Sequence, residues 1–146
     1  MLLGAVSLAP VPATAADSIV ANGGGRGTVD GVNPFSQFGF EVMFRDGAVS
    51  GRFNCLMAGA SAFPGFEPLM KVSGEITGGT ADAATGTAEF TGTGTLNLGP
   101  SGQMDATFLV GVEEGGPGVG KFQLTVIVPP FSLLEETVLS GHIMIH

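Results

Sequence analysis

Hydrophobic and polar residues alternate along most of the chain, in short runs separated by glycine- and proline-rich turns. Between Gln37 and Arg45, for example, phenylalanine or valine occupies every second position. A period of two is typical of strands in antiparallel sheets that bury one face and expose the other. The pattern predicts strands over residues 18–22, 27–30, 37–45, 48–57, 70–76, 86–98, 104–112, 122–128 and 136–146.

Each predicted strand has one apolar face, which we expect to point inward. Asp46-Gly47 is a strong signal for a tight turn and predicts a β-hairpin over residues 38–57. The expected inward residues are Phe38, Phe40, Val42, Phe44, Val49, Gly51, Phe53, Cys55, Met57, Met70, Val72, Gly74, Ile76, Ala88, Phe90, Gly92, Gly94, Leu96, Leu98, Met104, Ala106, Phe108, Val110, Val112, Phe122, Leu124, Val126, Val128, Leu139, Gly141, Ile143 and Ile145.

Several glycines fall on these inner faces, among them Gly92 and Gly94. A sheet that curls tightly crowds its concave side, and glycine relieves that crowding. The pattern therefore predicts an all-β antiparallel meander that forms a small closed or nearly closed barrel of about seven to nine strands. A β-sandwich is the alternative, because alternation alone does not decide closure. The segment GGGRGTVDG resembles a phosphate-binding loop only in composition, and we expect a bend there.

The length, net charge and cysteine content of the chain exclude several classes of function. The chain has 146 residues, enough for one domain, with 44% hydrophobic and only 12% charged residues. Its net charge of −8 argues against nucleic-acid partners and against anionic lipid surfaces. With one cysteine, an internal disulfide is impossible. We expect no cofactor and no membrane span.

The first residues, MLLGAVSLAPVPATAADS, read as an export signal, because a short apolar run precedes the cleavage motif Ala13-Thr14-Ala15. Cleavage is expected after Ala15 or Ala16, which gives a signal peptide over residues 1–16 and a single β domain over residues 17–146. No basic residue precedes the apolar run, so a truncated or misassigned start stays open. A hydrophobic N-terminal strand is the alternative interpretation. The predicted location is secreted, periplasmic or at the cell surface.

Few residues have a pattern that points to catalysis or metal binding. Cys55 has no neighbour that would activate a thiolate, so we expect it to be buried. His142 and His146 lie about 13 Å apart along a strand, too far to share one metal. Asp30, Asp46, Glu113 and Glu114 lie near predicted turns, where calcium binding stays open. We predict no catalytic residue and no metal site.

Five segments carry a resemblance to a known family: GGGRGTVDGVNPFSQFGFEV, GAVSGRFNC, AEFTGTGTLN, TFLVGVEEGGPGVGKFQLTV and LSGHIMI. Together they cover most of the mature chain, and it resembles the post-COAP domains, small secreted bacterial β domains found after choice-of-anchor modules. The resemblance implies an exported β domain with no established catalytic role. The chain departs from the family at residues 113–118, where an Asp-rich turn is common, and at Lys121, where an acid is common.

Three functions follow as hypotheses. The first is a non-catalytic exported barrel module that acts through its surface or loops in the envelope or the extracellular space. Its partner stays open, and an envelope protein and a small apolar ligand are the two candidates. The second is a barrel that binds a small apolar ligand, as a lipocalin does, between the lining residues Phe38, Phe40, Phe53, Phe90, Phe108 and Phe122. The third is an isomerase or cyclase at the barrel mouth. It needs a polar residue among those phenylalanines, and the periodicity places none there.

Overall fold

The structure is a computed structural model that describes residues 18–146 except positions 62 and 64. The predicted signal peptide therefore lies outside the described residues. The elements are β1 (Ser18–Thr28), β2 (Pro34–Arg45), β3 (Ala48–Ala58), the 3-10 helix η2 (Gly59–Ser61), β4 (Leu69–Asp82), β5 (Thr87–Asn97), the 3-10 helix η3 (Gly99–Ser101), β6 (Gln103–Glu113), β7 (Lys121–Val128), β8 (Phe131–Ser132) and β9 (Glu136–Ile145).

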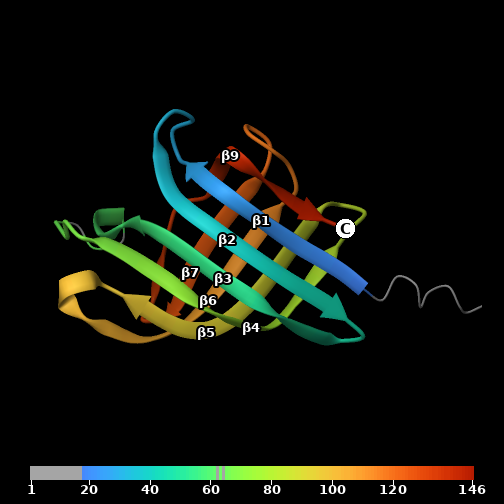
Figure 1. The fold of residues 1–146 in the computed structure, drawn as a ribbon, viewed down its shortest axis with the longest axis horizontal. Coiled ribbons are helices and arrows are strands. Elements are labelled where there is room, and N and C mark those ends of the chain that lie inside the picture. Colours follow the sequence, from blue (N-terminus) through green and yellow to red (C-terminus); the bar gives the residue numbers. More distant parts are fainter. Residues whose placement is uncertain (1–17, 62, 64) are drawn as a thin grey trace, which may run out of the picture.

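The strands form one antiparallel sheet that closes on itself. Strands β1 to β7 are adjacent in chain order, and β9 lies between β7 and β1, so hydrogen bonding runs in a ring through eight strands. The two-residue β8 pairs with Thr125 and Val126 of β7 and is not part of this ring. In Figure 1, β1 to β4 cross obliquely in front of β6 and β7. The prediction of an all-β meander with closed or nearly closed barrel architecture is confirmed.

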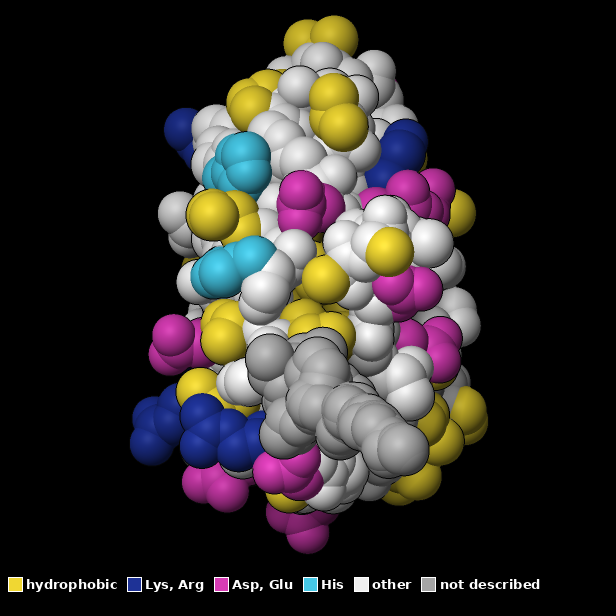
Figure 2. Space-filling model, turned by 90° about the vertical axis from the view of Figure 1, so that its right-hand side faces the viewer, with side chains coloured by type: hydrophobic (Ala, Val, Ile, Leu, Met, Phe, Trp, Pro, Cys, Tyr) yellow, Lys and Arg dark blue, Asp and Glu magenta, His cyan; other side chains and the backbone are white. Residues whose placement is uncertain are grey.

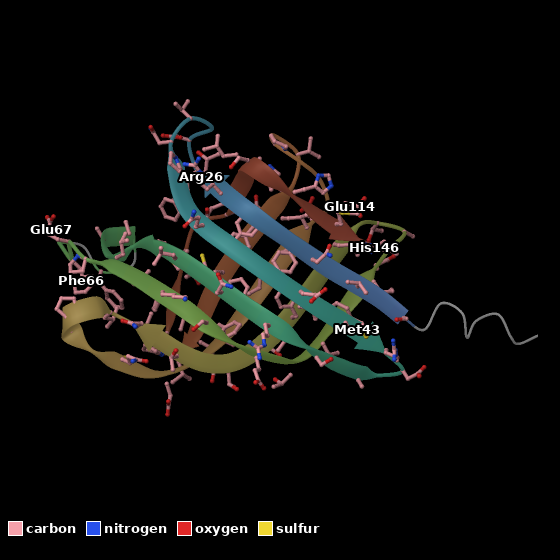
Figure 3. All side chains as sticks on the ribbon, in the orientation of Figure 1. Arg26, Met43, Phe66, Glu67, Glu114 and His146 are labelled. Atoms are coloured by element: carbon pink, nitrogen blue, oxygen red, sulfur yellow. The ribbon has the colours of Figure 1, made fainter. Side chains whose placement is uncertain are left out.

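The ring closes at β9 with the help of a loop. Strands β7 and β9 pair only at Lys121↔Thr137 and Phe122↔Glu136. Further along β9, the loop after β6 takes the place of β7: the amide N–H of Gly118 donates to the carbonyl of Val138 at 2.9 Å. The Glu114 carboxylate accepts a hydrogen bond from the Ile145 amide at 2.9 Å (Figure 3). A side chain and loop backbone thus complete the closure that a full strand would otherwise provide.

The predicted hairpin forms as the sequence indicates. Arg45 pairs with Ala48, so Asp46 and Gly47 alone make the turn, with φ values of 49° and 78°. Positive φ at both central residues is the conformation that matches the twist of two antiparallel strands. The hairpin places Phe38, Phe40, Phe53 and Cys55 on the inner face, where they are buried.

The inner-face glycines lie where neighbouring backbones approach closely. Gly74 on β4 pairs directly with Gly94 on β5. A Cβ added to Gly74 would lie 2.8 Å from the Gly94 Cα, closer than real side chains allow. At Gly92, an added Cβ would lie 2.9 Å from the tip of the Phe108 ring. Glycine therefore gives both the tight curl of the sheet and the space that one core ring occupies.

The predicted bend lies only at the end of GGGRGTVDG: residues 29–33 bend before β2, whereas the glycines from Gly23 to Gly27 do not break the first strand. Residues 18–22 and 27–30 are not separate strands, because β1 runs without interruption from Ser18 to Thr28. Its glycines pair with β2 on one side and with β9 on the other. A Cβ at Gly23 would lie 2.9 Å from the His142 carbonyl oxygen, so here glycine permits close packing between two neighbours rather than a change of direction.

Some inward assignments near the strand ends are also wrong. Met104 and Val128 are exposed, at 44% and 57%, because the barrel interior ends before these positions. Gly141 is exposed as well. The register of β9 against β1 shifts so that Arg26 pairs with Ser140 and Gly27 with Val138. Leu139 is the extra residue of this bulge, and the inward positions before it are Glu136 and Val138.

Candidate functional site

The six phenylalanines predicted to line the barrel do lie inside it, and their rings contact one another. Phe38 stacks on Phe122 with ring centroids 4.9 Å apart, and Phe122 stacks on Phe53 at 5.9 Å. From Phe53 the contacts continue to Phe108 at 5.3 Å. Phe40 and Phe90 complete the cluster, and none of the six side chains is more than 7% exposed. The rings thus pack against each other across the interior.

The expectation that no polar residue lies among these rings is wrong. Glu136 is only 1% exposed and Ser36 only 5%. Ser36 was missed because β2 begins at Pro34, which extends the inward pattern of Phe38 by one more position. Glu136 was missed because the bulge at Leu139 reverses the alternation of β9. The signal for Ser36 was available: it lies two residues before Phe38, at the next inward position of the same alternating pattern. Nothing in the sequence marks the bulge.

Residues of four strands surround the Glu136 carboxyl group. Glu136 starts β9 and faces Phe122 on β7, while its side chain lies over Gly27 on β1. A Cβ at Gly27 would lie 3.2 Å from the Glu136 Cδ, so the glycine leaves the space that the carboxyl occupies. Beyond Gly27, the Ser36 hydroxyl on β2 donates a 2.6 Å hydrogen bond to Glu136 Oε1. Glu136 Oε2 is buried without a hydrogen-bond partner.

Burial controls the chemistry of this cluster. It raises the pKa of Glu136 from 4.5 to about 7, although the hydrogen bond from Ser36 opposes the shift. The nearby Cys55 thiol is buried on β3, and burial raises its pKa far above the usual value. The charge of Glu136 adds to that increase, and a hydrogen bond with Ser36 opposes it. The carboxyl is therefore a weak acid in a buried site, and Cys55 is not an activated nucleophile.

The other candidate residues lie apart. His142 and His146 are exposed, and the two histidine side chains appear on one face in Figure 2. The Asp30 carboxylate closes its own turn, because it accepts hydrogen bonds from the amides of Asn33 and Val32, both at 2.8 Å. The amide hydrogen bonds from Asn33 and Val32 hold the pKa of Asp30 well below its usual range. Hydrogen bonds from the side chains of Asn33 and Thr28 lower this pKa further. Among the described residues, no three or more His, Cys, Asp and Glu side chains gather closely enough to hold a metal.

The outer face of the sheet carries open grooves, and three of them have volumes of about 440–460 Å³ each. The first groove, over the ends of β4 to β7, is mainly acidic and includes Asp82, Glu89, Glu113, Lys121 and Glu135. The third is lined by residues of β1, β2 and β9, including His142 and Glu41.

The second groove differs from the others in its charge. It lies over β1 to β4 and β9 and is lined by Gly25, Arg26, Gln37, Phe38, Asn54, Leu56, Lys71 and Ser140. No acidic residue lines it, although the chain as a whole carries 13 acids and only 5 lysines and arginines. We call it the Arg26–Lys71 groove. Figure 3 labels Arg26 near the end of β1.

No protein-family model, curated protein or solved structure matches the chain. The resemblance to post-COAP domains therefore stays a prediction. Among residues 18–146, with positions 62 and 64 set aside, no helix is long and apolar enough to span a membrane.

Proposed function

We propose that the protein is a non-catalytic module that acts through its outer surface or loops. The observation that supports this most directly is the phenylalanine cluster, whose rings occupy the barrel interior at contact distance from one another. A barrel that binds a ligand inside needs an open volume of a few hundred Å³, on the order of 300 Å³ or more. Three grooves of comparable size open on the outer face.

The buried acid does not favour catalysis. A general acid has to come within hydrogen-bond distance of its substrate. Glu136 is 1% exposed, and its one hydrogen-bond partner is Ser36. Cys55 is fully buried and its raised pKa keeps it protonated at neutral pH. Both groups are better explained as parts of the interior than as reacting groups.

We also propose that the module is exported, to the periplasm, the cell surface or the medium. The cleavage motif Ala13-Thr14-Ala15 supports this proposal. Strand β1 begins at Ser18, so cleavage after Ala15 or Ala16 would leave every described strand intact. Expression in a bacterial host with the natural N-terminus, followed by fractionation and intact mass measurement, tests it. A periplasmic or extracellular species that lacks residues 1–15 or 1–16 is expected, whereas a full-length cytoplasmic species would overturn the proposal.

Native mass spectrometry of protein purified from its own host tests the surface-acting function. The expected mass is that of the polypeptide alone or with a macromolecular partner. A small apolar molecule bound in one-to-one ratio would overturn the proposal in favour of a ligand-binding barrel. A small polar molecule in the same ratio would also contradict it and would favour an enzyme.

A further inference from the structure

The Arg26–Lys71 groove follows a row of residues that lie directly opposite one another on neighbouring strands. Arg26 on β1 pairs with Gln37 on β2, Gln37 with Leu56 on β3, and Leu56 with Lys71 on β4. On the far side, Arg26 pairs with Ser140 on β9. All these side chains lie on the outer face, and Arg26, Gln37, Lys71 and Ser140 are exposed. The row therefore forms a continuous track that is polar except at Leu56, with one cation near each end.

Of the three other cations on the strands, Arg52 and Lys121 lie opposite acids. Arg45, next to the hairpin turn, pairs with Ser18 and Ala48 and does not line the Arg26–Lys71 groove. Arg52 on β3 pairs with Glu41 on one side and with Glu75 on the other. Lys121 pairs with Glu113 and donates a hydrogen bond to Thr137.

By contrast, the residues directly opposite Arg26 are Gln37 and Ser140, and those directly opposite Lys71 are Leu56 and Asn97. The residues two positions before and two positions after each of these four partners carry no carboxylate either. In a protein of net charge −8, two cations thus share a groove without an acid to neutralise either of them.

We propose that this groove binds an extended acidic peptide segment of a partner protein, with two carboxylates that pair with Arg26 and Lys71. The assignment rests on the proposed surface-acting function and names its partner chemistry. Arg26 and Lys71 lie three strand spacings apart, which is about 14 Å. In an extended peptide, residues i and i+4 lie about 13 Å apart and point to the same side. Acidic residues at i and i+4 therefore match the two cations.

The residues between the cations suit a peptide. The side-chain amides of Gln37 and Asn54 each offer both donors and an acceptor, which match the N–H and C=O groups of a peptide backbone. Leu56 is partly exposed and provides an apolar contact between them. Flat aromatic side chains that would stack on a sugar ring or a base are missing, because Phe38 is 5% exposed and is the single aromatic residue of the lining.

NMR titration of the 14.7 kDa protein with short peptides tests the proposal. The probe is the peptide DSGSD with blocked termini, and the comparison peptides are NSGSN, which has no charge, and DDSGS, in which the acids are adjacent. We expect DSGSD to shift the amide signals of residues around Arg26, Gln37 and Lys71. NSGSN should cause no shifts, and DDSGS should bind several-fold more weakly.

Charge-reversal variants make the test specific. Arg26→Glu and Lys71→Glu should each weaken DSGSD binding about fivefold, the upper range for an exposed ion pair. Arg45→Glu is the matched control, because it changes the net charge equally at the hairpin turn far from the groove. Equal weakening by Arg45→Glu would mean general attraction and would overturn the proposal. Tighter binding of a polyuronate or of an oligonucleotide than of DSGSD would overturn the peptide assignment.

The two proposals fail in different ways. If DSGSD does not bind while native mass spectra show no interior ligand, the groove assignment is wrong and the surface-acting function stands. If a small molecule occupies the interior, the proposed function is wrong whatever the groove binds.

Discussion

At the scale of single residues, Glu136 is the least expected feature of the interior. It brings an ionisable group into a core of phenylalanine rings, with Ser36 as its one hydrogen-bond partner and with Oε2 unpartnered. Burying a charged carboxylate costs more free energy than one hydrogen bond returns, so the proton stays bound to a higher pH than in the unfolded chain. The pKa of Glu136 is about 7 in the folded protein, against an ordinary value of 4.5.

This difference makes folding stability depend on pH. Below pH 4.5 the carboxyl is protonated in both states and its proton does not affect stability. Between pH 4.5 and about 7 the unfolded chain loses the proton while the folded protein keeps it, so the free energy of unfolding falls. The total loss is about 3 kcal/mol at most. Above pH 7 this contribution levels off.

The variant Glu136→Gln tests this account, because glutamine keeps the shape and the acceptor for Ser36 but does not titrate in this range. Urea unfolding at pH 4.5, 5.5, 7 and 8 should show wild-type stability falling across the window, while the variant changes little. At pH 8 the variant should be the more stable of the two proteins. A variant with the same pH slope as the wild type would show that another group is responsible.

At the scale of elements, glycine positions decide how tightly neighbouring strands approach. Gly94→Ala should destabilise strongly, because its Cβ would lie 2.8 Å from the Ser73 carbonyl carbon on β4. The backbone cannot give way without separating β4 from β5, and we expect a loss of about 3 kcal/mol, as for other overpacked sites.

Gly111→Ala is the matched control, on the neighbouring strand β6. Its Cβ would meet no atom within 4 Å. This change should leave stability unchanged or raise it by about 0.5 kcal/mol, because alanine restricts the unfolded chain. Equal unfolding midpoints in urea for the two variants would contradict the close-approach role of Gly94.

The elements also show how far the sequence predicts this structure. The period of two predicted the strands, and Asp46-Gly47 predicted their tightest turn, because both signals are local. Positions that depend on pairing were predicted less well. Glycines interrupt the apolar pattern of β1, yet the strand pairs continuously on both sides through Gly25. The bulge at Leu139 depends on the register of β9 against β1. The burial of Glu136 could therefore not be predicted from the alternating pattern of one strand alone.

At the scale of the whole molecule, the closed ring and the phenylalanine cluster depend on each other. An eight-stranded barrel has an interior just wide enough for side chains to fill it. Phe53 is central to the filling, because its ring contacts those of Phe90, Phe108 and Phe122. A ligand-binding barrel needs free volume in its interior, whereas a barrel filled by its own side chains has none. A substitution at Phe53 is therefore the way to test whether the interior has free volume.

The variant Phe53→Ala should lose about 3–5 kcal/mol of stability, because it removes a buried ring and leaves a cavity. An apolar cavity of that size binds benzene, so thermal unfolding in buffer saturated with benzene should show a stabilised variant and an unchanged wild type. If Phe53→Ala does not fold, Phe53→Leu opens a smaller cavity with a smaller loss and serves in its place. Equal stabilisation of the wild type by benzene would mean that the interior already accepts an apolar ligand between its rings, contrary to the proposed surface-acting function.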